Sequence, residues 1–496
     1  MLVTRIGVSI IRHHILKMQT DRKKGMGDST YSGKKTGNDG KQTISSPNVI
    51  EMNGTRLGFF SSAPQNAHQK TILSSTPKKK SAHMESGYLD SQLEILKGTF
   101  PDQDKMDALA NISTFFYNSQ TSQRDTDDTL ETIKKYIMDV PAGDSLKIQA
   151  ITTIGSVFYS SAPKSANNVN LILPCLLEIT SNSNKIYSNE LKASAINSMQ
   201  PMFYWNSPIS EQQAKSILKQ MHDIASNAEE GIPVRANAIF LLNTIFYYSS
   251  DCLPQNTIEE NVGFVLPNLM KIAFESDSSY LRYAALEALG PVFFTGKAPA
   301  QDVAEFLSRA TIVIENPTLG ENERGTAIIS VGFVFTAKSN DPNSPYQPYF
   351  PEQAAALVPA LASIMKAPSL SEAVRARAVE SIGYIFNRVK DKELSPDFHL
   401  QVPPLVDLIG DKTAGDYIRA QAIRAINNYV IANGNIPEVE PKNLVSLLLD
   451  ITKNRDNGEI MRERSMETLY NIFKYWDAGE INSVLPVLTD MLNSEN

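Results

Sequence analysis

The feature that most constrains this chain is an internal repeat with a period of about 45 residues. Nine segments align on a small residue, and successive anchors lie 42 to 51 residues apart. Such a period is typical of arrays in which each structural unit contacts mainly its neighbours. The repeat therefore predicts one elongated array rather than the roughly three globular domains that 496 residues would otherwise suggest. The anchors are Ala108, Ala150, Ala195, Ala238, Ala285, Ala327, Ala378, Ala422 and Ser465.

The residues around each anchor recur position by position. The residues one and four positions after the anchor are aliphatic or Met, and the residue eight after it is Phe in every copy except one, which has Val430. These offsets lie on one side of an α-helix, so each segment is predicted to be a helix with a buried apolar stripe. The phenylalanines are Phe116, Phe158, Phe203, Phe246, Phe293, Phe335, Phe386 and Phe473.

Polar residues mark where these helices begin. A capping or acidic residue usually stands six positions before the anchor, as is typical of a first helical turn. A basic residue stands three before it in all nine copies, where the helix dipole does not favour a positive charge. We expect each basic group to bond an acid or a carbonyl of the neighbouring repeat, forming a ladder. The predicted starts are Asp102, Asp144, Asn189, Ser279, Glu321, Glu372, Asp416 and Glu459, and the basic residues are Lys105, Lys147, Lys192, Arg235, Arg282, Arg324, Arg375, Arg419 and Arg462.

A second apolar stretch precedes each of these helices and often contains a proline. Pro174, Pro267, Pro359 and Pro403 recur at a similar distance before the second helix, so they should kink or start a first helix rather than abolish it. One repeat is thus a pair of helices. The stretch 480–493 is predicted to be a last first-type helix that closes the array.

The two helices together resemble the HEAT repeat. The copies most similar to its second helix read VRARAVESIGYIF from Val374, YLRYAALEALGPVFF from Tyr280 and IRAQAIRAINNYV from Ile418, and the resemblance covers about Gly87 to Asn493. The chain departs from the family where HEAT repeats usually carry Asp, six residues before the Arg. The resemblance implies an all-α, right-handed α-solenoid of about nine HEAT-like helical pairs, with the second helices on the concave side and a scaffolding, transport or adaptor role.

Charge divides the chain into two predicted regions. Residues 1–90 hold 14 basic and 6 acidic side chains, which leaves 33 basic and 48 acidic side chains in 91–496. Residues 1–87 are predicted to be a disordered basic arm because their apolar residues are too sparse to form a core, and 88–496 to be the solenoid. Within the arm, residues 1–17 are basic and free of acids, which leaves open an organelle presequence or a membrane-surface anchor.

The composition excludes several kinds of chemistry. A body with a net charge of −15 is unsuited to nucleic acid, and two cysteines cannot make a disulfide framework or a Cys-based zinc site. Only His222 and His399 lie in the body, too few for a His-based metal centre. We therefore expect no catalytic residue, metal or cofactor, and a cytoplasmic location, with an organelle presequence or secretion as open alternatives. An enzyme of the HEAT-like DNA glycosylase or hydroxylase type is the third functional hypothesis.

Two features of the sequence are not required to form the repeat. The first is an aromatic and amide row just after the recurring Phe, and residues of these types are enriched at binding hot spots. It is similar to the Trp/Asn ladder with which armadillo proteins hold extended peptides, although packing between layers is an alternative reading. The candidate partner-binding residues are Tyr117, Tyr159, Tyr204, Trp205, Asn206, Tyr247 and Tyr248.

The second feature is the insertion AKSNDPNSPYQPYFPEQ from Ala337. Prolines at every third position favour a polyproline II stretch, and it would display Tyr346, Tyr349 and Phe350 as a candidate contact loop. A stiff surface connector is the alternative. The leading functional hypothesis is a non-enzymatic scaffold or adaptor that binds a protein or peptide, with a basic or extended segment, along its concave face. The second is a membrane-associated adaptor tethered by residues 1–17.

Overall fold

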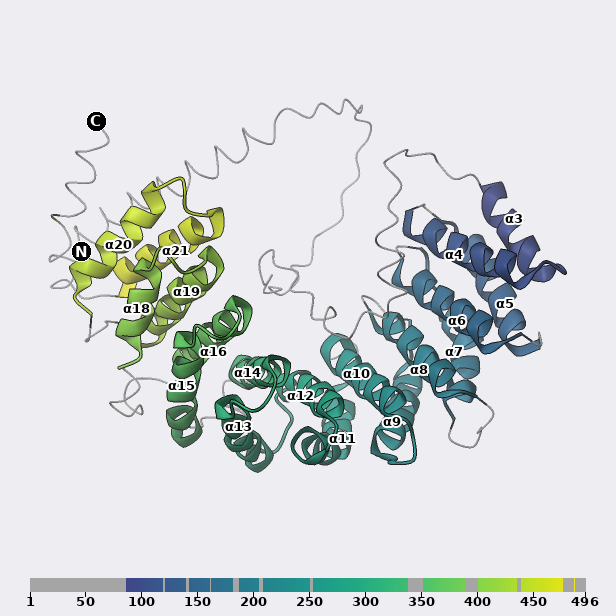
Figure 1. Ribbon diagram of the computed structural model, residues 1–496, viewed down its shortest axis with the longest axis horizontal. Coiled ribbons are helices and arrows are strands. Elements are labelled where there is room, and N and C mark those ends of the chain that lie inside the picture. Colours follow the sequence, from purple (N-terminus) through teal and green to yellow (C-terminus); the bar gives the residue numbers. More distant parts are fainter. Residues whose placement is uncertain are drawn as a thin grey trace, which may run out of the picture. The chain divides into compact units, whose positions relative to one another are not determined.

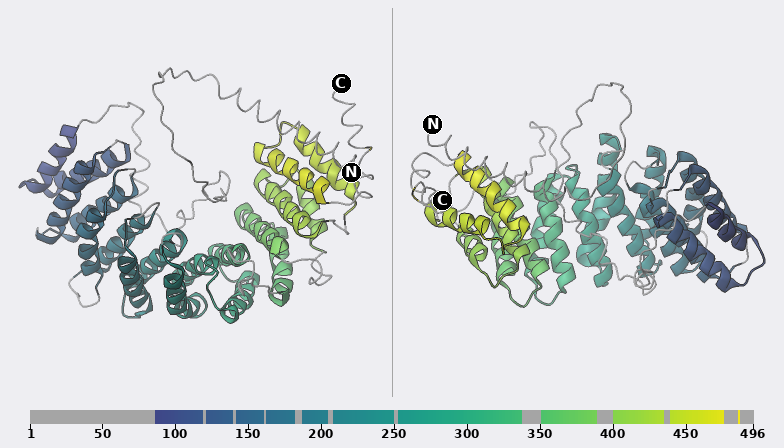
Figure 2. Two further views of the ribbon diagram at one scale, coloured as in Figure 1. Left: turned by 180° about the vertical axis from the view of Figure 1, so that it is seen from behind. Right: turned by 90° about the horizontal axis from the view of Figure 1, so that it is seen from above.

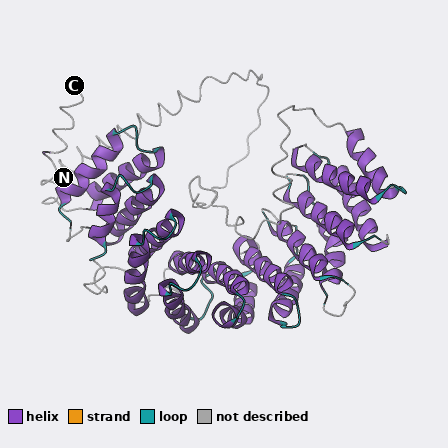
Figure 3. Cartoon of the chain, viewed as in Figure 1, coloured by secondary structure: helices purple, strands orange, loops and turns teal. Residues whose placement is uncertain are grey.

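The structure is a computed structural model that describes residues 86–475 and Pro486, with gaps at 119–120, 140–141, 161, 182–186, 205–207, 250–252, 338–350, 389–399 and 435–438. Helices and loops make up this part of the chain, and no strand occurs in it (Figure 3). The helices follow one another in sequence order along the array (Figures 1 and 2). The all-α fold class predicted from the repeat is confirmed.

Nine helical pairs make up the array within the described residues, and the helices of each pair pack on each other. The first helices are α3 (Ser86–Lys97), α5 (Gln123–Asp139), α7 (Ala166–Thr180), α9 (Glu211–Ser226), α11 (Gln255–Glu275), α13 (Ala300–Glu315), α15 (Pro351–Lys366), α18 (Val402–Gly410) and α20 (Pro441–Lys453). The second helices are α4 (Asp102–Asn118), α6 (Asp144–Tyr159), α8 (Asn189–Met199), α10 (Ile232–Ser249), α12 (Ser279–Phe294), α14 (Glu321–Thr336), α16 (Glu372–Arg388), α19 (Asp416–Asn433) and α21 (Glu459–Tyr475).

The predicted starts of the second helices are confirmed at all eight positions where a polar residue marks them, from Asp102 to Glu459. The core lies between the two rows of helices, and all eight recurring phenylalanines are buried in it. The prolines also behave as expected. Pro174, Pro267 and Pro359 lie inside first helices, and Pro403 lies in the first turn of α18.

The second helices pack more closely on one another than the first helices do. Small residues allow this approach: a Cβ added at Gly383 of α16 would lie only 2.9 Å from the Cα of Ala425 in α19. Buried hydroxyls then bond across the row, as when Ser330 Oγ donates to the Leu286 carbonyl at 2.6 Å.

Acids at the start of the second helices link neighbouring repeats. Glu321 accepts a hydrogen bond from the backbone N–H of Ser371 at 3.0 Å, and Asp416 accepts one from Gly458 at 3.1 Å. Each donor lies at the N-terminus of the next second helix, where backbone N–H groups lack partners within the helix and favour a negative charge. Acids and backbone N–H groups therefore link neighbouring repeats at these two junctions.

The expectation for the basic row is wrong for four arginines, which bond within their own repeat. The Nε of each donates to a carbonyl ten residues earlier, in the last turn of the preceding first helix, at 2.9 to 3.0 Å. A positive charge is favoured there by the dipole of that helix, which offsets its unfavourable place on the second helix. The four are Arg235, Arg324, Arg375 and Arg419. Lys192 and Arg282 bond acids of the next repeat, Glu230 and Glu323, and Lys105 lies 5.7 Å from the ring centroid of Tyr136 in the next repeat.

Several predictions lie outside the described residues. These are the basic arm up to residue 85, with the segment 1–17, the candidate contact loop with Tyr346, Tyr349 and Phe350, and the closing helix at 480–493 apart from Pro486.

Candidate functional site

The predicted tyrosine row lies at the C-terminal ends of the second helices. Because successive residues of an α-helix are turned by about 100°, the residue after a buried Phe points away from the core. Tyr117, Tyr159 and Tyr247 follow Phe residues in this way and are 54%, 48% and 38% exposed. Tyr204 reaches the same place by another route, since α8 gives way at Pro201 to a short 3-10 helix, Gln200–Phe203, which Tyr204 terminates.

The structure brings five of the seven predicted binding residues into one continuous contact. Ring centroids lie 5.8 Å apart for Tyr117 and Tyr159, 6.0 Å for Tyr159 and Tyr204, and 4.9 Å for Tyr204 and Tyr248. Tyr248 in turn lies 4.9 Å from Tyr247. All these pairs are tilted or edge-to-face, arrangements that each stabilise by about 0.5–1.5 kcal/mol beyond burial.

Two phenylalanines that the sequence analysis missed extend this contact. Tyr247 lies 6.4 Å from Phe333 of α14, and Phe333 lies 5.7 Å from Phe294 of α12. Phe294 could have been found, because it stands nine residues after its anchor like Tyr117 and Tyr159. Phe333 stands six residues after its anchor Ala327, about one helical turn before the offset of nine at which Tyr117 and Tyr159 stand. The repeat pattern therefore does not point to it. We call the seven rings of Tyr117, Tyr159, Tyr204, Tyr247, Tyr248, Phe294 and Phe333 the aromatic strip.

Burial changes the acidity of four of the five tyrosines of the strip. Burial raises the pKa of Tyr117, Tyr204, Tyr247 and Tyr248 above the ordinary value, and neighbouring tyrosines of the strip add to the effect at Tyr204. These four tyrosines therefore present apolar ring faces together with phenol groups that keep their protons at physiological pH. Surfaces of this kind join a large apolar area to directional hydrogen bonds.

The remaining predicted site residues lie outside the described part of the chain. These are Trp205 and Asn206 in the row, and Tyr346, Tyr349 and Phe350 in the insertion. The similarity to a Trp/Asn ladder therefore stays a prediction, whereas the tyrosine part of the row forms a surface.

Further along the second helices, the inner side chains form polar networks instead of a strip. Arg424 of α19 donates to Glu380 of α16 at 2.9 Å and lies 5.1 Å from the ring centroid of Tyr384. The Tyr384 hydroxyl donates to the same carboxylate at 2.9 Å. These groups bond one another between two repeats, so they stabilise the packing of α16 on α19.

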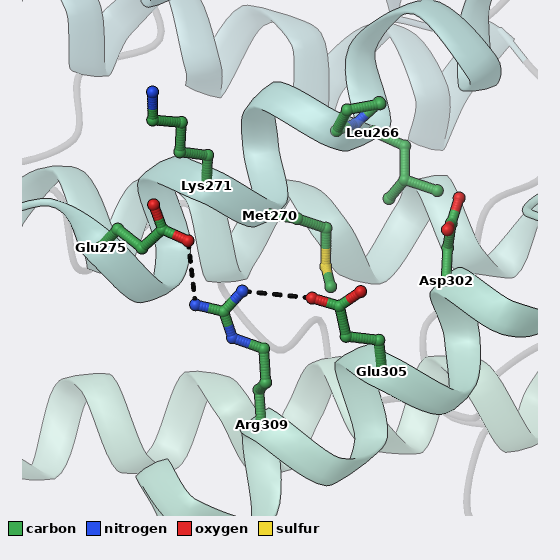
Figure 4. Close-up of a pocket in the computed structure, with 8 residues that line it drawn as sticks. Leu266, Met270, Lys271, Glu275, Asp302, Glu305 and Arg309 are labelled. Carbon is green, nitrogen blue, oxygen red and sulfur yellow. Dashed lines mark hydrogen bonds and ion pairs between the residues drawn. The ribbon is translucent and has the colours of Figure 1, made fainter.

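A shallow pocket of about 280 Å³ lies between two first helices, α11 and α13 (Figure 4). Arg309 crosses it and pairs with Glu275 at 3.3 Å and with Glu305 at 3.2 Å, while its guanidinium lies 4.5 Å from the ring centroid of Phe274. The pair with Glu275 joins the two helices, whereas the pair with Glu305 lies within α13. Arg309 therefore serves as a link between neighbouring repeats.

No group of three or more His, Cys, Asp or Glu side chains in the described ranges could hold a metal ion. Among the helices that the structure describes, none is long and apolar enough to span a membrane. The one described cysteine, Cys175, is buried in α7, and burial raises the pKa of its thiol to about 11.

No protein-family model matches the chain, and no curated protein matches it. Among solved structures it is similar to Kap121p, at 16% identity over 84% of this chain and 40% of that chain, with a TM-score of 0.40. It is similar to Kap121p bound to Nup53p at 15% identity, over 84% and 44% of the two chains, with a TM-score of 0.41. An engineered protein matches at 11% identity, over 77% and 98%, with a TM-score of 0.36. The chain thus spans less than half of the Kap121p chains, and likenesses this weak carry no functional conclusion.

Proposed function

We propose that this chain is a scaffold that binds an extended segment of a protein partner across the C-terminal ends of its second helices. The contact surface is the aromatic strip. The observation that carries the proposal is the unbroken series of ring contacts from Tyr117 in α4 to Phe333 in α14. Three of its tyrosines remain more than a third exposed, although fully packed rings would bury that surface.

The composition of the strip favours a protein ligand. Tyrosine is enriched among the residues that dominate binding energy, because it offers apolar area and a hydroxyl on a side chain with few rotatable bonds. Contiguous apolar surface on a soluble protein is typical of an interaction site. An ordinary packing role explains the partly buried rings of Tyr204 and Tyr248, but it does not require Tyr117 and Tyr159 to be half exposed.

The arrangement of the strip favours an extended ligand over a compact one. Its rings come from six successive repeats, each of which contributes residues near the end of its second helix. A partner that contacts all of them must cross the helices from repeat to repeat, which an extended segment does with few residues per layer. The proposed role is non-enzymatic, and Arg309 of the α11–α13 pocket is paired with Glu275 and Glu305.

Affinity purification from native cells, followed by mass spectrometry, tests the proposal. The double variant Tyr117→Ala/Tyr159→Ala removes the two most exposed rings of the strip. The matched control, Tyr470→Ala/Tyr475→Ala, removes two exposed tyrosines of α21 that lie outside it. We expect the control to retain the partners of the wild-type chain and the strip variant to lose at least one of them. Equal recovery by both variants, with unfolding midpoints like that of the wild type, would contradict the proposal.

A further inference from the structure

A second feature of the second helices, near the aromatic strip, is a carboxylate for which the described residues provide no ion pair. Glu287 lies on α12 near the middle of the second-helix row and is partly exposed. Its carboxylate accepts hydrogen bonds from Asn243 Nδ2 of α10, at 3.5 Å, and from the hydroxyl of Tyr283. It forms no ion pair with any lysine or arginine in the part of the chain that the structure describes. Arg377 of α16 acts on it electrostatically from a distance, without pairing.

A glutamate at the equivalent position of another repeat forms an ion pair with an arginine. Glu380 stands two residues after its anchor Ala378, as Glu287 does after Ala285, and Arg424 pairs with it at 2.9 Å. In the repeat after Glu287, the position that corresponds to Arg424 is occupied by Ile329. Three glutamates thus stand at this offset, Glu287, Glu380 and Glu467, and Glu380 is paired with an arginine of the neighbouring repeat whereas Glu287 is not.

Aromatic rings lie near the unpaired carboxylate. Tyr280 and Tyr283 precede Glu287 by seven and four residues, so all three share one face of α12. The ring of Phe240, on α10, lies 6.1 Å from the rings of both tyrosines. Ring faces attract cations, most strongly where water is partly excluded. A carboxylate beside several rings is a combination suited to an ammonium or guanidinium group.

When no cation is bound, burial disfavours the ionised form of Glu287. It raises the pKa of Glu287 to about 7, and the hydrogen bond from Tyr283 and the distant charge of Arg377 offset this only in part. A cation entering the site would favour the ionised form. The body of the chain also carries 33 basic against 48 acidic side chains, so its field attracts basic partners.

We propose that Glu287 and the rings of Phe240 and Tyr280 form a subsite for a Lys or Arg side chain of the protein segment bound on the aromatic strip. The two surfaces share a face, because Phe294 of the strip follows Glu287 by seven residues, or about 10 Å along α12. Tyr247 of the strip likewise follows Phe240 by seven residues on α10. This inference rests on the proposed function, since the strip holds the segment whose basic residue the subsite recognises.

Selection of a displayed library of random dodecapeptides on the purified full-length chain tests the subsite. The wild-type chain should enrich peptides that combine aromatic or aliphatic residues with a Lys or Arg at one fixed place. Glu287→Gln should still enrich peptides but lose the preference for that basic residue. Glu305→Gln is the matched control, because it removes the same charge from the row of first helices and should select like the wild type.

The most enriched peptide then gives a quantitative test. Changing its basic residue to Gln should weaken binding to the wild-type chain by about thirtyfold or more, and should weaken binding to Glu287→Gln far less, because the two changes remove the same pair. Peptides without a fixed basic residue, or an unchanged preference in Glu287→Gln, would overturn the subsite and leave the proposed function standing. No enrichment by the wild-type chain would overturn both.

Discussion

The ring centroids of Tyr204 and Tyr248 lie 4.9 Å apart, although the two tyrosines belong to different repeats. Tyr204 is in place because α8 ends in a 3-10 turn at Pro201, and Tyr248 because it is the second residue after the buried Phe246. Their contact joins the rings of α4 and α6 to those of α10, α12 and α14. Without it the aromatic strip would be two separate patches.

Close packing of the second helices predicts a strong effect at Gly383. A Cβ there would meet the Cα of Ala425 at 2.9 Å, and backbone cannot move aside cheaply. We expect Gly383→Ala to lower the free energy of unfolding by about 1–3 kcal/mol, as overpacked substitutions do. Gly263→Ala is the matched control, because nothing lies within 4 Å of its added Cβ in α11. That variant should gain up to about 1 kcal/mol from helix propensity. Urea denaturation of the two variants measures both effects, and equal changes would contradict the packing argument.

The basic row should stabilise the chain through its carbonyl bonds. Arg375 Nε donates to the Met365 carbonyl at 2.9 Å inside one repeat, and losing a charge-assisted bond of this kind costs about 1.5–3 kcal/mol. Arg375→Ala should therefore destabilise the chain by that amount in urea denaturation. Arg309→Ala, which breaks the partly exposed pairs of the α11–α13 pocket, should cost less than about 1 kcal/mol per pair. The reverse order would show that these bonds contribute little.

Glu287 predicts a pH dependence of stability. Its pKa is raised from 4.5 to about 7 by burial, so the folded chain holds the proton through a range in which the unfolded chain has released it. The contribution of Glu287 to the free energy of unfolding therefore falls as the pH rises from about 4.5 to about 7, and it is constant above that range. Glu287→Gln removes this effect, and its unfolding free energy should exceed that of the wild type by up to about 3 kcal/mol at pH 8. A gap between the two proteins that does not grow between pH 4.5 and pH 7, measured by urea titration, would disprove the assignment.

The buried thiol of Cys175 predicts slow alkylation. A pKa raised from 9.0 to about 11 lowers the thiolate fraction at pH 8 about a hundredfold, and the thiolate is the reactive form. In a Cys252→Ser variant, which leaves one thiol, iodoacetamide should react slowly with the native chain and rapidly in denaturant. Reaction at the same rate in both conditions would mean that α7 opens readily.

The sequence predicted much of the fold because each repeat needs the same residues in the same places. The helix starts at Asp102 and Asp416 follow from polar residues at a fixed offset, and the outward tyrosines follow from the residue after each buried Phe. The partners of the arginines could not be predicted in this way, because a backbone carbonyl leaves no mark in residue types. Phe333 was missed because it does not stand at the offset of the other strip residues, and Glu287 because its lack of a cation depends on the next repeat, where Ile329 stands at the position of Arg424.

Site-specific photo-crosslinking in native cells tests the central claim most directly. A benzoyl-phenylalanine at position 159 would stand on the aromatic strip, and one at position 312 would stand on α13 of the row of first helices, where Ile312 is 68% exposed. The account predicts a discrete crosslinked product of higher mass from position 159 and none of that mass from position 312. Crosslinking to the same partner from position 312 alone, or equally from both, would contradict binding on the strip.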